Sequence, residues 1–208
     1  MLYAIGGGRK IRATPGARAA CSYCGAEMLA KCGEVNIWHW AHIPSATCDV
    51  WAGGETYWHL WWKSRVPESW CEVLVHKQGI THIADIKRPD GLVVEVQHSS
   101  LSPSEIRARE AFYGNMLWLF DTRDCLGLDL RKRGGYHTFR WKHARTSLAY
   151  TSKRTYLDVG RNVFELKRMH RGPPCGGWGR LWDVGDFVKM LCNCAVHRVT
   201  APAALCLR

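Results

Sequence analysis

Two short runs of β-branched and apolar residues, joined by a tight turn, constrain the fold of this chain more than any other stretch. Ile80–Lys87 and Leu92–Gln97 have the composition of β-strands, and Pro89-Asp90-Gly91 between them is typical of a turn. Each predicted strand carries a carboxylate near its middle, Asp85 in the first and Glu95 in the second. Since pairing of the strands would bring the two acids together, they could converge on a divalent cation, which binds hard oxygen ligands.

A simpler interpretation is that both acids occupy exposed positions on a half-solvated sheet. Acids are depleted in strands but do occur there. The hairpin alone therefore supports the two interpretations about equally. Side chains alternate along a strand, which places Glu95 on the same face as Val93 and Gln97. An acid among so many valines is poorly suited to an ordinary buried strand, and the neighbouring segments favour a functional site.

The charge of the chain indicates a polyanionic partner. The sequence has 208 residues and a formal net charge of +11, and nucleic acid is the commonest partner of so basic a protein. An anionic membrane surface is the competing partner, but no basic amphipathic helix or lipidation motif supports it. No apolar run approaches the ~18 residues of a membrane span, so we expect no membrane association.

Cysteine and histidine spacing near the N-terminus predicts a structural zinc site. Cys21 and Cys24 form a Cys-x-x-Cys pair followed by glycine, His39 and His42 follow downstream, and Cys48 is a fifth candidate. Zinc takes four such ligands in structural sites, so we expect four of the five to bind, and which four stays open. The alternative, unliganded core cysteines and histidines, is less consistent with the paired spacing.

The chain contains 10 cysteines in all and shows no signal peptide ahead of them. We therefore expect reduced thiols, some of them metal ligands, and a cytoplasmic protein.

A predicted helix that starts near Gly54 adds polar candidates before the hairpin. Glu55 and His59 lie on one helical stripe, with Lys63 beside it. Glu55 could be no more than a favourable charge at the start of the helix. Because it comes just before the acidic hairpin, it is also a candidate for a third metal-binding acid.

A second helix is predicted to follow the hairpin. Ser102-Pro103-Ser104-Glu105 has the pattern of a capping box with proline in the first turn. Arg109 and Tyr113 follow Glu105 at four-residue steps along one face. Arg109 could form an ordinary pair with Glu105 or contact a phosphate near the site. An apolar strand, Met116–Asp121, comes next.

The order helix, three strands, helix, strand predicts an α/β fold with a mixed central sheet flanked by helices. We divide the chain into a basic arm with a zinc-binding module (1–50), a core (51–125) and a basic C-terminal region (126–208) that forms a β-rich extension. In that extension, Thr155–Met169 is expected to form a hairpin that turns at Gly160, and Val184–Cys194 a closing helix.

Basic residues alternate with aromatic ones in the C-terminal region, a pattern that can track a nucleic-acid backbone and can also be merely a solvated face. The aromatic residues concerned are Tyr136, Phe139, Trp141 and Tyr150.

Taken in order over residues 20–121, these motifs resemble the competence protein CoiA-like nucleases, a family within the PD-(D/E)XK nuclease superfamily. No single motif is specific, but the ordered set is. The matching elements are Cys21/Cys24, His39-Trp40-Ala41-His42, Glu55…His59…Lys63, Ala84-Asp85, Glu95-Val96-Gln97-His98-Ser99 and Glu105/Arg109/Tyr113. The resemblance implies a restriction-endonuclease-like core and a metal-dependent nuclease that hydrolyses DNA phosphodiester bonds.

Roles for individual residues follow from the resemblance. Asp85 and Glu95 would bind Mg²⁺ or Mn²⁺, Glu55 would bind it directly or through water, and Gln97 would orient the attacking water. Lys63 and Arg109 would face phosphate, and His59 and Tyr113 are further expected contacts to nucleic acid.

One position departs from the superfamily pattern. Where the superfamily has a lysine two residues after the glutamate, this chain has Gln97, which carries no charge. We expect Lys63 or Lys87 to supply the missing positive charge; otherwise activity would be weak or absent. The alternatives are a non-catalytic, zinc-stabilised nucleic-acid-binding protein on a nuclease fold, or a nuclease directed at RNA or branched DNA.

Overall fold

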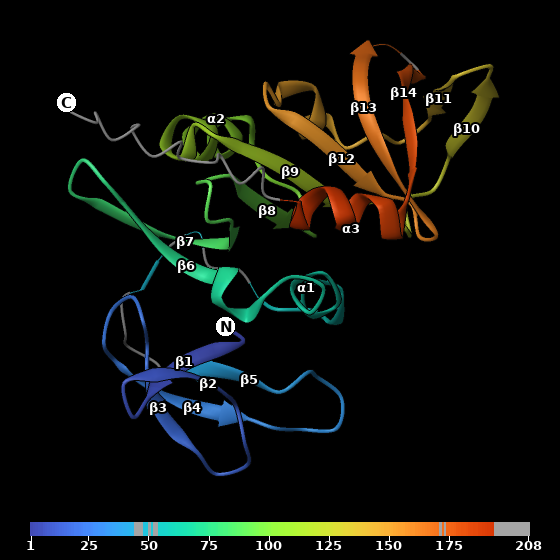
Figure 1. The fold of residues 1–208 in the computed structure, drawn as a ribbon. Coiled ribbons are helices and arrows are strands. Elements are labelled where there is room, and N and C mark those ends of the chain that lie inside the picture. The colour runs from blue at the N-terminus through green and yellow to red at the C-terminus, as the bar shows by residue number, and fades with distance from the viewer. Residues whose placement is uncertain (44–47, 50, 52–53, 171, 173, 194–208) are drawn as a thin grey trace, which may run out of the picture.

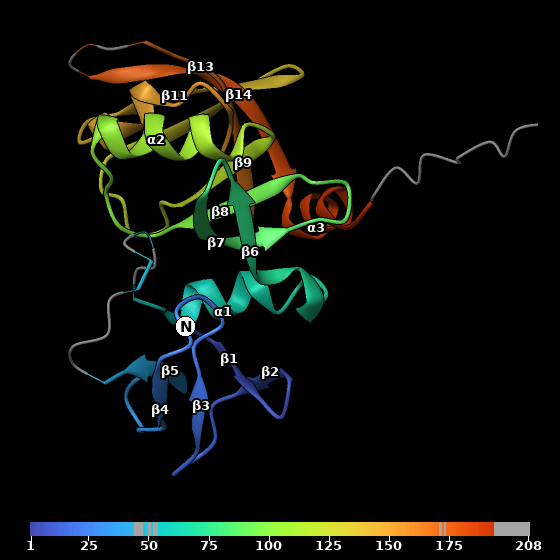
Figure 2. The same ribbon diagram turned by 90° about the vertical axis from the view of Figure 1, so that its left-hand side faces the viewer.

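The computed structural model of the chain describes residues 1–193, except for residues 44–47, 50, 52–53, 171 and 173. Its strands form two separate sheets (Figure 1). A small N-terminal sheet lies on one side of helix α1 (Tyr57–Lys63), and a large sheet lies on the other (Figure 2).

The N-terminal sheet has five strands in the order β2-β1-β3-β4-β5, and all of its pairs are antiparallel. Its strands are β1 (Tyr3–Gly6), β2 (Arg9–Arg12), β3 (Arg18–Ala20), β4 (Glu27–Lys31) and β5 (His39–His42). The sequence predicted a basic arm at the start of the 1–50 region, but residues 3–20 instead supply three strands of this sheet. Gly7 and Gly8 allow this, because both adopt positive φ values (58° and 76°) in a tight turn between β1 and β2.

The large sheet has nine strands in the order β10-β11-β14-β13-β12-β9-β8-β7-β6. It is mixed, as the sequence predicted: β9 pairs in parallel with β8 and with β12, and the other pairs are antiparallel. Its strands are β6 (Cys71–Lys77), β7 (Ile80–Lys87), β8 (Val93–Gln97), β9 (Met116–Asp121), β10 (Leu128–Arg133), β11 (Tyr136–Trp141), β12 (Arg154–Asp158), β13 (Asn162–His170) and β14 (Cys175–Asp183).

Helices cover both faces of this sheet, and alternation along the central strands creates two cores. Val94 and Val96 of β8 pack with α1 and with α3 (Val184–Cys192), whereas Val93 packs on the opposite face with α2 (Pro103–Tyr113). Two short 3₁₀ helices, Glu68–Trp70 and Thr146–Tyr150, complete the described elements. Of the helices described, none is long and apolar enough to cross a membrane.

The helix starts follow local sequence signals. Ser102 caps α2, with its hydroxyl accepting from the Glu105 N–H, as the capping box predicted. Helix α1 is capped by Thr56 and begins at Tyr57, so Glu55 lies just before the helix and not in its first turn. Helix α3 ends at Cys192, and Cys194, the last residue of the predicted closing helix, lies outside the described residues.

The large sheet continues across residue 125, where the sequence suggested a division. Strand β12 pairs with β9, and β12 and β13 form the hairpin predicted around Gly160. Asp158 at the end of β12 is buried and accepts hydrogen bonds from the indole N–H groups of Trp58 (2.7 Å) and Trp62 (2.9 Å) in α1. This carboxylate therefore connects the C-terminal region to the first helix.

We expect the substitution Asp158→Ala to lower the free energy of unfolding by about 3 kcal/mol or more, because it leaves two buried indole donors without an acceptor. Urea denaturation monitored by circular dichroism would measure the change. The matched control is Asp124→Ala at an exposed position, which we expect to shift stability by less than about 0.5 kcal/mol. Equal stability of the two variants would contradict this role of Asp158.

Candidate functional site

Four of the five predicted zinc ligands gather at one end of the N-terminal sheet. The ligand atoms of Cys21, Cys24, His42 and Cys48 all lie within 4.8 Å of one another. Cys21 Sγ is 3.7 Å from Cys48 Sγ, and Cys24 Sγ is 3.3 Å from His42 Nε2. With Zn–S and Zn–N bonds of about 2.3 and 2.0 Å, a tetrahedral zinc needs sulfur–sulfur and sulfur–nitrogen separations of about 3.8 and 3.5 Å. The Cys₃His cluster could therefore bind zinc with little rearrangement.

His39, the fifth candidate, is not part of this cluster. Its Nδ1 lies 2.8 Å from the carbonyl oxygen of Ile37. His39 and His42 stand at opposite ends of β5, so their spacing satisfied the sequence pattern although only His42 faces the cysteines.

Burial, together with the neighbouring Cys21, raises the pKa of the Cys48 thiol to about 12. A dication among the sulfurs would reverse this effect by stabilising the thiolates.

The predicted acids line a second site, a pocket of about 320 Å³ beside the N-terminal ends of α1 and α2. Strands β7 and β8 pair with Ile86 opposite Val94. Beyond this pair, the carboxylate of Asp85 accepts a hydrogen bond from the Val96 N–H at 3.0 Å. The side chain of Asp85 thus bridges the two strands, and about a quarter of it (24%) is exposed. Glu55, Glu95 and Gln97 also line the pocket.

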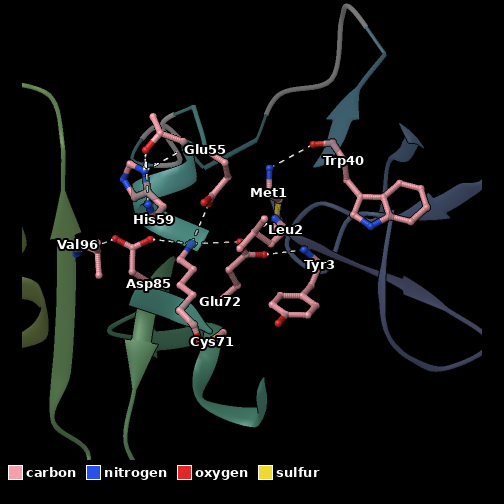
Figure 3. Close-up of polar contacts among 12 residues, drawn as sticks. Met1, Leu2, Tyr3, Trp40, Glu55, His59, Cys71, Glu72, Asp85 and Val96 are labelled. Carbon is pink, nitrogen blue, oxygen red and sulfur yellow. Dashed lines mark hydrogen bonds and ion pairs between the residues drawn. The ribbon is translucent and has the colours of Figure 1, made fainter. Parts of the chain in front are cut away.

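Glu55, Asp85 and Glu72 point toward one another (Figure 3), and all three contact the ammonium group of Lys63. Its Nζ is 2.8 Å from Glu55 Oε1, 3.0 Å from Asp85 Oδ1 and 3.2 Å from Glu72 Oε1. The side chain of Lys63 is only 1% exposed. Of the two lysines considered for the missing positive charge, Lys63 reaches the pocket, and Lys87 is not among the residues that line it.

Arg109 supplies a second buried cation. Its guanidinium donates to Glu95 Oε2 at 2.7 Å and to the Trp51 carbonyl at 3.3 Å. Its ion-pair partner is Glu95 and not Glu105, the helical neighbour that the sequence suggested. At 7% exposure, it orients an acid of the pocket.

Beside these cations, two of the buried acids have lowered pKa values and two have raised ones. Burial would raise the pKa of Asp85 and of Glu72, but Lys63 and donated backbone N–H groups hold both pKa values below the ordinary range. Burial raises the pKa of Glu55 to about 7, with Lys63 opposing the shift. Burial and the charge of Asp85 raise the pKa of Glu95 to about 7, with Arg109 opposing. Although burial lowers it, the pKa of Lys63 is well above its ordinary value, because three carboxylates surround it.

Two carboxylate oxygens in the pocket, Glu55 Oε2 and Glu95 Oε1, have no hydrogen-bond partner among the residues that the structure describes. Buried oxygens of this kind are costly unless a donor or a cation completes them. As oxygen ligands, they are chemically suited to a hard cation. The acids that carry them, however, lie farther apart than the predicted metal site requires. Among the described residues, only the Cys₃His cluster brings three or more ligand atoms within 4.8 Å of one another. The three predicted acids are more widely spaced than that: Lys63 contacts Glu55 and Asp85, and Arg109 holds Glu95.

The remaining predicted residues occupy different places. Gln97 lines the pocket and donates to the Ser99 carbonyl at 2.9 Å. His59 also lines the pocket, and its Nδ1 accepts from the Thr56 N–H to complete the helix cap. Tyr113 was expected to contact nucleic acid, but its hydroxyl donates to the Ile83 carbonyl at 3.3 Å and it does not line the pocket.

Glu72 is a site residue that the sequence reasoning missed. It accepts the N–H groups of Leu2 and Tyr3 at 2.8 and 3.0 Å while it contacts Lys63. Its φ of 47° is in the left-handed region, where a residue with a side chain is strained by about 1 kcal/mol or more. An acid at the start of the apolar run Cys71–His76 was the only signal available in the sequence.

His98 at the pocket rim was also missed as a site residue. Its Nδ1 is 2.8 Å from Asp121 Oδ2, and its side chain is 46% exposed. Arg123 holds the same carboxylate, with its Nε 2.8 Å from Asp121 Oδ1. The ring is therefore fixed in orientation at the mouth of the pocket.

Comparison with known proteins gives one match. Residues 15–51 match the family model described as "Competence protein CoiA, N-terminal domain". This segment contains all five candidate zinc ligands, and over these residues it confirms the resemblance to the CoiA family seen in the sequence. No curated protein and no solved structure matches the chain.

We expect the protein to bind one zinc ion per chain, and His42→Ala or Cys48→Ser to reduce the zinc content severely. His39→Ala is the matched control, because His39 lies outside the cluster, and it should retain the full zinc content. Elemental analysis of the purified variants measures both outcomes. Zinc loss in His39→Ala, with retention in His42→Ala, would show that the ligands were assigned wrongly.

We expect Lys63→Met to destabilise the protein by about 3–5 kcal/mol at pH 8, because three buried acids lose their cation. Without Lys63 the pKa values of these carboxyls should rise, and a raised acid pKa costs stability as pH increases. In the unsubstituted protein, the lowered pKa values of Asp85 and Glu72 give stability that is lost as pH falls. The deficit of the variant should therefore be smaller at pH 5, as urea denaturation at both pH values would measure. Lys87→Met is the control, and a pH-independent deficit would argue against the carboxylate cluster.

Proposed function

We propose that this CoiA-like protein is a metal-dependent nuclease that hydrolyses DNA phosphodiester bonds in the pocket of Glu55, Asp85 and Glu95. One observation carries the proposal: Glu55 Oε2 and Glu95 Oε1, two buried carboxylate oxygens with no partner within the described part of the chain, belong to the same pocket as the partly exposed Asp85. The family match is consistent with a competence-related protein.

The order of the elements supports a restriction-endonuclease-like core. Helix α1 is followed by β6, β7 and β8, then by α2 and β9, the arrangement that the sequence predicted. Asp85 and Glu95 come from the antiparallel pair β7–β8, and Glu55 precedes α1.

Asp85, Glu95 and Glu55 would hold Mg²⁺ or Mn²⁺. When bound, the metal would stabilise developing negative charge and make a bound water more acidic. Arg109 orients Glu95, and Lys63 keeps Asp85 ionised in the buried site. Gln97 is fixed through Ser99, so its amide oxygen is suited to accept a hydrogen bond from the attacking water.

His98 is suited to protonate the leaving oxygen. Asp121 occupies its Nδ1, so Nε2 is the nitrogen available for proton transfer. Arg145 donates to the His98 carbonyl at 2.7 Å and brings positive charge to the same rim, where a phosphate would enter.

A second candidate function is nucleic-acid binding without catalysis. Lys63 and Arg109 already neutralise Asp85 and Glu95, which is the observation that favours it. In that case the buried cations would serve only to stabilise the core, and no divalent ion would be needed.

We expect the protein to cleave DNA with Mg²⁺ or Mn²⁺, and Asp85→Asn and Glu95→Gln each to reduce the rate at least 100-fold, because each removes a ligand for the metal. Gel analysis of linear and circular DNA, with RNA and branched DNA in parallel, would measure the rates and the substrate class.

Asp124→Asn and Glu68→Gln are matched controls at exposed positions outside the pocket. They should cleave at the unsubstituted rate. Undiminished cleavage by Asp85→Asn and Glu95→Gln would place the site elsewhere. Salt-sensitive DNA binding without cleavage at any metal concentration would favour the non-catalytic function.

A further inference from the structure

A bare, basic sheet face lies at the end of the large sheet away from the acid pocket. Strands β10 and β11 and the adjoining parts of β13 and β14 extend beyond α3, which lies across the opposite ends of β13 and β14 (Figure 1). The described helices therefore leave one side of these four strands uncovered.

Strand register defines what this side presents. Across the strands, Arg131 of β10 is opposite Thr138 of β11, Thr138 is opposite Trp178 of β14, and Trp178 is opposite Arg168 of β13. The alternate positions, such as Leu130 and Phe139, point to the core beneath. We call the outward side the arginine face. It is formed by Arg131, Arg133, Tyr136, Thr138, Arg140, Arg168, His170 and Trp178.

The arginine face has the charge of a phosphate-binding surface. Its four arginines are exposed, and they come from three different strands. The register places two acids on this side of the sheet: Asp129, which pairs with Arg131 at 2.9 Å, and the buried Glu165, which pairs with Lys167. This composition is complementary to a polyanion.

Two aromatic rings stand exposed among these cations. Tyr136 is 45% and Trp178 is 44% exposed, and their ring centroids are 5.9 Å apart. Phe139 and Trp141, which the sequence grouped with Tyr136, are buried in the core instead. Large rings left in water on a basic surface provide stacking platforms for unpaired bases.

A hollow of about 480 Å³ opens on the part of the arginine face formed by Arg131, Arg140 and His170. Gly176 lies at its base and cannot be replaced by a larger residue without a clash. A Cβ at that position would come within 2.9 Å of the Phe139 carbonyl oxygen and 3.0 Å of His170 Cε1. The close approach of the strands therefore keeps this part of the surface free of a side chain.

We infer that the arginine face binds single-stranded DNA, with phosphates held by the arginines and bases stacked on Tyr136 and Trp178. Single strands are favoured over duplex, because the bases of a duplex are already stacked and do not offer their faces to a protein ring. The choice of DNA over RNA rests on the proposed function. The binding itself requires neither the metal nor the acid pocket.

Fluorescence anisotropy with a labelled oligo-dT, without added divalent metal, tests the inference on the full chain. Trp178→Ala should weaken binding about fivefold or more, because one stacking platform is lost. The double variant Arg131→Ala/Arg140→Ala should weaken binding at least tenfold. It should also reduce the slope of log affinity against log salt by about 1.4, since each phosphate contact to a single strand contributes about 0.7.

Lys132→Ala and Trp61→Ala are the matched controls. Lys132 is an exposed cation on β10 that points to the opposite side, and Trp61 is an exposed ring on α1. Both should bind nearly as the unsubstituted protein does.

The inference is overturned if the arginine-face variants bind like these controls, or if a DNA hairpin duplex of equal length binds as tightly as oligo-dT. Tighter binding of an RNA oligomer would overturn the choice of DNA. Because binding and cleavage are measured separately, loss of the nuclease proposal would leave this result standing, and the reverse also holds.

Discussion

A single buried ammonium organises the centre of this protein. Lys63 ends α1 and is almost entirely excluded from solvent, a state that a lysine tolerates only with compensating charge. Glu55, Asp85 and Glu72 supply that charge from three separate segments. Charge attraction is strong in a low-dielectric environment, and the hydrogen bonds of the ammonium group add direction to it. Together they fix where the helix, the hairpin and the start of β6 stand relative to one another.

The same ion cluster joins the N-terminal sheet to the large sheet. Glu72 accepts the backbone N–H groups of Leu2 and Tyr3, and Lys10 donates to the backbone carbonyls of Cys71 and Glu72. Leu2 and Tyr3 also pack in the core that contains Trp58 and Trp62. The Cys₃His module is thus attached through the very residue that contacts Lys63. The position of the N-terminal sheet and the geometry of the acid pocket are therefore linked through one carboxylate.

Several parts of the fold and site could be predicted from local sequence. The strand hairpin around Pro89-Asp90-Gly91 and the capping box at Ser102 depend on neighbouring residues, and both form as expected. The Cys-x-x-Cys pair is similarly local, and its turn brings both thiols into one cluster. The partner of Arg109 could not be inferred, because Glu95 lies on another element and the helical spacing suggested Glu105 instead.

What the sequence alone determined was the set of chemical groups and the elements that carry them: five zinc-ligand candidates, two mid-strand acids, and an α/β order of helices and strands. Tertiary structure decided which of those groups meet. It excluded His39 from the cluster, added Glu72 to the acids and set the ammonium group of Lys63 against Glu55, Asp85 and Glu72. It also separated the aromatic residues of the C-terminal region into buried and exposed sets. The physical reason is that propensity and spacing act within one segment, whereas charge pairing and burial depend on contacts between segments far apart in the chain.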